Sequence, residues 1–216
     1  MVHAFSPTVE PIAPRPMSLA EFLAWDEGSD RLYELIEGMP MPIYDPTADH
    51  EDVADLICDL LKAHCLAQDL PYVPKRSKLV AVGTPDSQVT ARRADIVVFD
   101  RAVWEGMKGL SSSAMAYTPP PLVIEVVSTN WRDDYLTKLA EYESIGVQEY
   151  WIVDHAGLGG VRYLGRPKQP MLSIYVMDSE ETEYGEPQQF REDEKVISPV
   201  LTGLSVTARQ ILGGIG

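Results

Sequence analysis

The order of hydrophobic patterns along the chain predicts a mixed α/β fold, in which helices pack on one sheet. Residues 121–127, PLVIEVV, form a nearly continuous apolar run of the kind found in strands that are covered on both faces. A helical pattern between Asn130 and Gly146 follows it, and a second strand pattern, VQEYWIVD, occupies residues 147–154. Such a strand–helix–strand unit gives a parallel pair of strands joined by a crossover helix. The other strands can be antiparallel, so the sheet should be mixed.

The sequence pattern of the N-terminal half predicts two helices and four strands. Ser18 and Glu21 have the spacing of a capping box, so the first helix should begin at Ser18 and end near Gly28. After it, in order, we expect strands at 31–38 and 39–45, a long helix at about 47–68, and strands at 72–82 and 91–100.

The rest of the chain is predicted to be mostly loop and strand. Residues 101–119 should form a loop with one helical turn. Further on we expect strands at 161–165, 171–177 and about 195–198, and a last helix at 206–212.

The domain organisation follows from length and composition. A chain of 216 residues suits one domain, which we place at residues 18–216. Residues 1–17 contain four prolines and lack the basic start and apolar run of a signal peptide, so they are expected to form a flexible lead.

The cysteines and the short lengths of the apolar runs indicate the cellular compartment in which the protein should reside. Cys58 and Cys65 fall in the predicted long helix, where a separation of roughly 10 Å along the axis is too great for a disulfide. They should be buried free thiols in a reducing environment. No apolar run approaches the length of a membrane span. We therefore expect a cytoplasmic protein, most simply a bacterial one.

The net charge of −15 comes from 33 acidic and 18 basic residues. It argues against broad electrostatic binding to nucleic acid, although a local basic surface remains compatible with it. Most of the excess negative charge should be a solvated surface that keeps the protein soluble. It also fits a site that gathers carboxylates around a divalent cation.

Three charged side chains occupy unexpected places. Alternation puts Glu125 on one face with Val123 and Val127, as a single carboxylate in a strand that should be buried. A buried carboxylate needs a cation, a proton or several donors. At a strand end, however, Glu125 could face solvent or pair with an arginine, and periodicity alone leaves both interpretations open.

Asp95 and Lys138 are less conspicuous when each is considered alone. Asp95 shares a predicted face with Val97 and Phe99, and it could simply bond nearby backbone at a strand start. Lys138 borders the apolar stripe of the crossover helix, and it could form an ordinary surface pair with Asp134 four residues earlier.

Together these three residues form a chemically coherent set. Two carboxylates on neighbouring strands can hold Mg²⁺, which prefers oxygen ligands and keeps several of its waters. A metal ion activates a bound water and neutralises charge on a phosphate, and a nearby ammonium can stabilise the charge that develops. The set therefore suits metal-dependent hydrolysis of a phosphodiester.

The segment PPPLVIEVVSTNWRDDYLTKLAEYESIGVQEYWIVD resembles the signature of a large bacterial group, the Uma-two family of putative restriction endonucleases in the PD-(D/E)XK superfamily. The resemblance extends to YELIEG, ADIVVFD and SPVLTGLSVTARQIL, and so covers about residues 18–212. It implies a restriction endonuclease-like core with flanking helices and extra antiparallel strands. It also implies Mg²⁺ or Mn²⁺ as the metal, DNA as the substrate and a homodimer as the assembly.

The resemblance also implies roles for individual residues. Asp95 matches the aspartate of the PD element, Glu125 matches the (D/E) position, and Lys138 matches a lysine that has moved from the position of Val127 to the following helix. Glu34 matches an N-terminal acidic residue that helps to hold metal. His50 matches a histidine of many relatives, although its spacing slightly favours a core or capping role over a catalytic one. Ala94 stands where the PD element has proline.

A local group of basic residues precedes Asp95 in the chain: Lys75, Arg76, Lys78, Arg92 and Arg93. These side chains could contact DNA phosphates, or they could protect an edge strand from aggregation. The sequence thus favours a metal-dependent endonuclease with Asp95, Glu125 and Lys138 at its centre. The alternative is a module of the same fold that acts in binding or dimerisation without catalysis.

Overall fold

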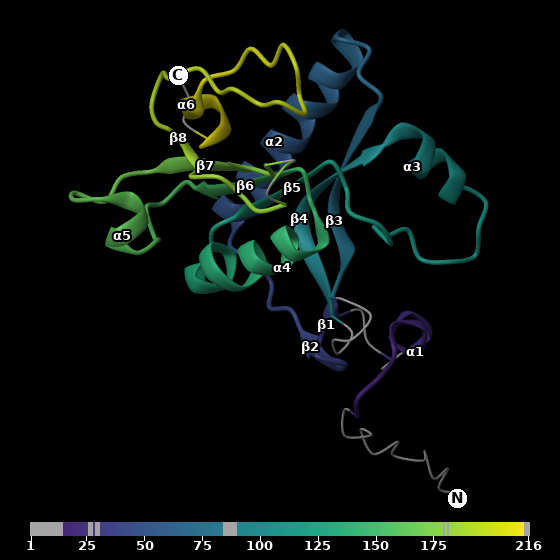
Figure 1. Cartoon of the computed structure of the whole chain (residues 1–216). Helices are drawn as coiled ribbons and strands as arrows, with labels where there is room; N and C mark the ends of the chain where they lie inside the picture. The colour runs from purple at the N-terminus through teal and green to yellow at the C-terminus, as the bar shows by residue number, and fades with distance from the viewer. Residues whose placement is uncertain are drawn as a thin grey trace, which may run out of the picture.

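One mixed sheet forms the centre of the computed structural model (Figure 1). Its described strands are β1 (Tyr33–Ile36), β2 (Met39–Pro42), β3 (Tyr72–Val82), β4 (Thr90–Asp100), β5 (Leu122–Val126), β6 (Glu149–Asp154), β7 (Met171–Val176) and β8 (Gln188–Phe190). Their spatial order is β2-β1-β4-β5-β6-β7-β8, and β3 also pairs with β4. The β5–β6 pair is parallel and the other pairs are antiparallel, which confirms the predicted mixed sheet and its crossover unit.

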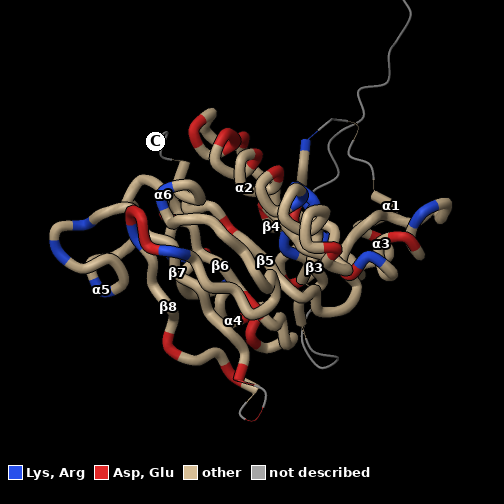
Figure 2. The backbone as a smooth tube through the Cα atoms, turned by 90° about the horizontal axis from the view of Figure 1, so that it is seen from above, with Lys and Arg blue, Asp and Glu red and all other residues tan. Residues whose placement is uncertain are grey.

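Helices cover both faces of this sheet. They are α1 (Leu19–Ala24), α2 (Ala48–Ala67), α3 (Arg101–Met107), the π-helical segment η1 (Asp133–Thr137), α4 (Lys138–Ile145), α5 (Val161–Leu164) and α6 (Ala208–Ile211). In two perpendicular views α2 and α4 lie on opposite faces (Figures 1 and 2). The segment η1–α4 is the predicted crossover helix, so Lys138 lies over the sheet.

Two large apolar clusters hold the two layers of helices to the sheet. On the α2 side, Ile57 and Leu61 pack with Ile124 and Trp151. On the α4 side, Tyr142 belongs to a second cluster with neighbouring strand residues. Because both faces of β5 and β6 are covered, every residue of these two strands is buried.

The structure describes residues 15–25, 28, 31–83, 90–178, 180 and 182–213. Most of the predicted lead, residues 1–14, lies outside this range. The backbone N–H of its last residue, Met17, donates to Gly38 O at 2.7 Å. None of the described helices is long and apolar enough to cross a membrane.

Local sequence signals correctly marked several helix ends. Ser18 and Glu21 form the capping box of α1, and Thr47 caps α2 through the backbone N–H of His50. The helix α4 ends at Gly146, whose φ of 84° is favourable for glycine. The two cysteines are buried and free in α2, as predicted.

Some predictions for the C-terminal half were wrong. Residues 161–164 form the short helix α5 and not a strand, and Gly160 and Gly165 cap its two ends. Residues 195–198 contribute one isolated bridge, from Lys195 to Thr207. The strand β8 was missed, since its three residues include a single apolar side chain and give no alternation. The segment predicted as a loop with one helical turn contains the seven-residue helix α3.

Candidate active site

The candidate site lies where one edge of β4 loses its strand partners. The strand β3 pairs with β4 along its whole length, so β1 and β5 share the opposite edge. On that edge β1 pairs only at Ala91, and β5 joins at Ile96. Between these points Arg93 N donates to Glu34 Oε1 at 2.8 Å, and Asp95 N approaches Glu125 Oε2 at 3.4 Å. The carboxylates of Glu34 and Glu125 thus take the place of the carbonyl groups with which a neighbouring strand would bind these N–H groups of β4.

The regular alternation of β4 is interrupted at this point. Ala94 and Val97 pack in the same apolar cluster although they are three residues apart. On β3, Ser77 adopts a positive φ of 51° and is skipped in the pairing of the two strands, opposite Asp95. The predicted sharing of one face by Asp95 with Val97 and Phe99 was therefore wrong, because alternation does not run through this irregularity.

The side chain of Asp95, a residue of β4, contacts β5 and the start of α2. Its Oδ2 accepts from Val126 N at 2.7 Å and lies 3.3 Å from His50 Nε2. The same imidazole nitrogen lies 2.9 Å from Val126 O. Burial raises the pKa of Asp95, but the contact with His50 and the charge of Lys138 outweigh it and hold the pKa below its ordinary value. The side chain keeps 22% exposure, so this ionised carboxylate is accessible from solvent.

Glu125 is buried against α4, on the predicted face. Its side chain is 1% exposed, and it accepts from Tyr142 OH at 2.7 Å and from Lys138 Nζ at 3.0 Å. Burial raises the pKa of Glu125 well above its ordinary value, although Lys138 opposes the shift. The carboxylate that the sequence identified as misplaced is thus satisfied by donors from the crossover segment.

Lys138 is buried between two carboxylates. Its Nζ lies 3.0 Å from Glu125 Oε2 and 3.1 Å from Asp134 Oδ1, and its side chain is 11% exposed. The predicted partner Asp134 was correct, but a surface pair was wrong, since Asp134 is buried as well. Burial lowers the pKa of Lys138, and the nearby carboxylates outweigh it and raise the pKa well above its usual range.

Asp134 lies in the π-helical segment η1, four residues before Lys138, so the two side chains share one face of the crossover segment. A π-helical turn widens the helix and is often found at functional sites. Tyr150 OH, from β6, donates to the backbone oxygen of Asp134 at 2.9 Å and ties the segment to the sheet. Burial raises the pKa of Asp134 to about 6.

The cluster contains more negative than positive groups. Asp95, Glu125 and Asp134 face one ammonium, that of Lys138, so protons or a further cation must balance the charge. Each carboxylate has about four lone-pair positions, and the bonds above leave some of them free. The oxygen donors of Asp95 and Glu125 fit Mg²⁺, which would complete its shell with water. The described residues contain no group of three or more His, Cys, Asp or Glu side chains arranged to hold a metal.

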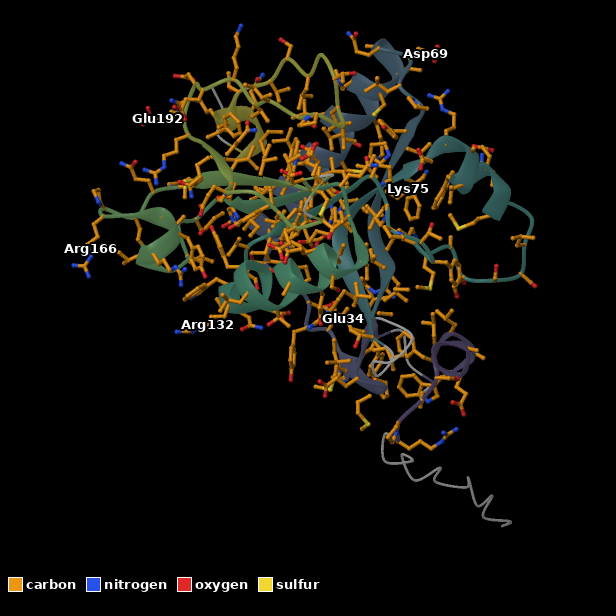
Figure 3. The ribbon with its side chains drawn as sticks, viewed as in Figure 1. Glu34, Asp69, Lys75, Arg132, Arg166 and Glu192 are labelled. Atoms are coloured by element: carbon orange, nitrogen blue, oxygen red, sulfur yellow. The ribbon has the colours of Figure 1, made fainter. Side chains whose placement is uncertain are left out.

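Two predicted site residues have other partners. Glu34 lies on β1 below α4 (Figure 3), and its two oxygens accept from Arg93 N and from Arg92 Nη1 at 3.3 Å. Arg92 is 5% exposed, and its guanidinium also binds Glu141 and lies near Asp133. Arg92, which the sequence predicted as a DNA contact, thus has its side chain buried among carboxylates.

The other basic residues are more accessible. Lys75 Nζ lies 4.5 Å above the Trp104 ring, and Arg76 binds the carboxylates of Glu51 and Asp55 on α2. Arg93 Nη1 donates to Ser77 O at 2.9 Å. Basic residues gather around β3 and β4, whereas acidic residues line the outer side of α2 (Figure 2).

The raised pKa of Asp134 predicts a measurable pH dependence of stability. A carboxyl group whose pKa is higher in the folded chain contributes stability below its ordinary pKa, and loses it as the pH rises through the folded pKa. For Asp134 that window runs from about pH 4 to about pH 6. Urea unfolding should show that Asp134→Asn gains stability relative to wild type across this window. A constant difference between the two proteins would contradict the shift.

Sequence reasoning missed three contributors to the site. Tyr142 was not among the predicted site residues, although it lies four residues after Lys138 and its hydroxyl could have indicated a polar role. The burial of Asp134 was missed because an aspartate four residues before a lysine on a helix also fits a surface pair. The role of Arg92 depends on carboxylates from three separate segments, so no sequence spacing could show it.

The comparisons with known proteins agree with this fold. One similar solved structure is a crystal structure described as a "putative nuclease belonging to DUF820" from Anabaena variabilis ATCC 29413, with a TM-score of 0.68 and 17% sequence identity. The match covers 92% of this chain and 99% of the other. The fold is thus that of the restriction endonuclease-like α/β proteins.

The sequence also assigns the chain to a protein family within this fold. The model of the Uma2 family, described as "Putative restriction endonuclease", matches residues 19–209. The chain belongs to this family, as the resemblance implied. No curated protein matches it.

Proposed function

We propose that this protein is a metal-dependent endonuclease that hydrolyses phosphodiester bonds of DNA. The observation that carries the proposal is the convergence of Asp95, Glu125 and Lys138, from two strands and the crossover segment, at one buried, acidic site. Membership of a family of nucleases supports the reaction class. In the cell we expect a cytoplasmic homodimer.

Asp95 and Glu125 would hold Mg²⁺ or Mn²⁺, and the carboxylate of Glu34 would help to hold the same ion. The bound metal would lower the pKa of a coordinated water and neutralise charge on the phosphate. Of the chain's own groups, Asp95 is ionised and partly exposed, so it can orient a ligand or water at the solvent side. Tyr142 and Lys138 fix the orientation of Glu125. The ammonium of Lys138 would stabilise negative charge that develops on the attacked phosphate.

The face formed by β3 and β4 is the proposed DNA surface. Lys75, Lys78 and Arg93 would contact phosphates, together with Arg76, whose partners on α2 would compete with DNA for its guanidinium. Such contacts position the substrate without reading its sequence. His50, which touches both Asp95 and Val126 O, would keep Asp95 in place.

The direct test is cleavage of supercoiled plasmid with Mn²⁺ or Mg²⁺ by wild type and Asp95→Asn. Asparagine can still accept from Val126 N, so the fold should persist while the ligand charge is lost. We expect cleavage to fall by at least about 100-fold, because loss of residues that merely support metal ligands already costs 10–100-fold.

The matched control is Asp193→Asn, which changes an exposed aspartate paired with Arg209. It should cut like wild type, and EDTA should stop both proteins. Equal cleavage by Asp95→Asn and wild type would disprove the assignment. A wild-type protein that cuts nothing with either metal would favour the non-catalytic module.

A further inference from the structure

Arg92 is the most heavily paired buried cation near the candidate site. Its Nε lies 2.6 Å from Glu141 Oε2 and its Nη2 lies 3.0 Å from Glu141 Oε1, so the two side chains form a bidentate pair. Its Nη1 lies 3.3 Å from Glu34 Oε2 and 3.6 Å from Asp133 Oδ2. The side chain is 7% exposed. A guanidinium suits such a position, because its planar fork can bind several carboxylates at once.

These contacts join four elements that meet beside the candidate site. Arg92 belongs to β4, Glu34 to β1, Asp133 to η1 and Glu141 to α4. Between Asp133 and Glu141 the crossover segment carries Lys138. Arg92 thus holds the chain on both sides of Lys138, and it does so from a strand position three residues before Asp95.

The placement of Lys138 requires such a restraint. Its ammonium contacts Glu125 and Asp134 at about 3 Å in a buried site. Productive geometry at a catalytic site must be held within about 0.5 Å by the surrounding residues. A bidentate ion pair has a defined direction, which it adds to the packing of Tyr142 and its neighbours in the apolar cluster.

We infer that Arg92 is a positioning residue that fixes the Lys138-bearing segment against the strands of Asp95 and Glu125. This inference rests on the proposed function, since it assigns Arg92 a part in the same reaction. Arg92 does not touch the substrate, because its guanidinium is enclosed by carboxylates. Its effect is transmitted through Asp133 and Glu141 to Lys138.

The first test measures the position of Lys138 without using cleavage. Wild type, Arg92→Gln and the milder Glu141→Gln are treated with an amine acylating reagent, and modification of Lys138 is followed by mass spectrometry. Lys62 and Lys108, which are exposed, give the reference rate. We expect Lys138 to react about tenfold faster in both variants, because the local opening of its segment becomes easier.

The buried thiols of Cys58 and Cys65 separate this effect from general unfolding. They lie in α2, on the opposite face of the sheet, and should stay protected from a thiol reagent in both variants. Unchanged reactivity of Lys138 would overturn the inference. So would exposure of Lys138 only together with the two cysteines, which would indicate a purely structural role.

The second test applies once cleavage by wild type is established. Arg92→Gln should lower kcat by about 100-fold, as expected for a catalytic group displaced by roughly 1 Å, while KM for DNA changes little. Arg92→Lys, which keeps the charge but loses the fork, should recover part of kcat. The exposed matched change Arg209→Gln should leave both constants unaltered. A rise in KM with unchanged kcat would instead mark Arg92 as a DNA contact, contrary to the inference.

Discussion

Replacement of Lys138 by methionine is expected to remove cleavage and a large part of the stability together. Methionine has a similar length and no charge, so Glu125 and Asp134 would remain buried without their shared cation. Loss of one partner of a buried ion pair costs about 3–5 kcal/mol. A positioned group that assists proton transfer or charge stabilisation contributes about 10²–10⁴-fold to the rate. Urea unfolding and plasmid cleavage measure the two effects.

The stability loss of Lys138→Met should depend on pH in a defined direction. Without the ammonium, the two carboxyl groups bind protons still more strongly, and protonation relieves the unfavourable burial of their charge. The variant should therefore be closest to wild type near pH 5 and furthest from it near pH 8. A gap that stays constant over this range would show that lost packing, and not the ion pair, explains the cost.

An exposed lysine provides the matched control for this substitution. Lys62 pairs with Asp59 on the outer side of α2, where both side chains are at least half exposed. Surface pairs of this kind are worth about 0–1 kcal/mol. Lys62→Met should consequently cost little stability at any pH and leave cleavage intact.

The elements that could be predicted are those with strong local signals. The apolar run at 121–127 specified β5 because both of its faces are buried, and Gly146 specified the end of α4. Alternation also placed Glu125 on the correct face, since β5 is regular throughout. Asp95 and Lys138 were predicted because they form a chemically coherent set with Glu125 and match the family pattern, and the structure brings the three residues to one place.

The features that escaped prediction depend on distant contacts or on irregular backbone. The face of Asp95 could not be read from alternation because β4 departs from it at this residue. Arg92 was predicted as a basic residue that could contact DNA or protect an edge strand, and it is buried because carboxylates from β1, η1 and α4 surround it. Glu149 was likewise not singled out, because it lies near the start of the predicted strand at 147–154.

Glu149 in fact holds the C-terminal segment to the sheet. It is fully buried, and its carboxylate accepts from Trp151 Nε1 at 2.5 Å, from Ser198 Oγ at 2.9 Å and from Val200 N at 2.9 Å. Burial raises the pKa of Glu149, although these three donors oppose the shift. One side chain therefore satisfies donors from β6 and from the segment that leads to α6.

Glu149→Ala is accordingly expected to destabilise the protein by about 3 kcal/mol or more, because each buried donor left without an acceptor costs about 1–3 kcal/mol. Urea unfolding measures the total loss of stability. Hydrogen exchange at the amides of Val200 and Leu201 shows where the loss occurs, because the Val200 amide donates to Glu149 and the Leu201 amide donates to Ser198 Oγ. Glu105→Ala, at an exposed pair with Lys108, is the control and should cost less than about 1 kcal/mol. If Glu149→Ala cost no more than this control, the buried carboxylate would not be what anchors the C-terminal segment to β6.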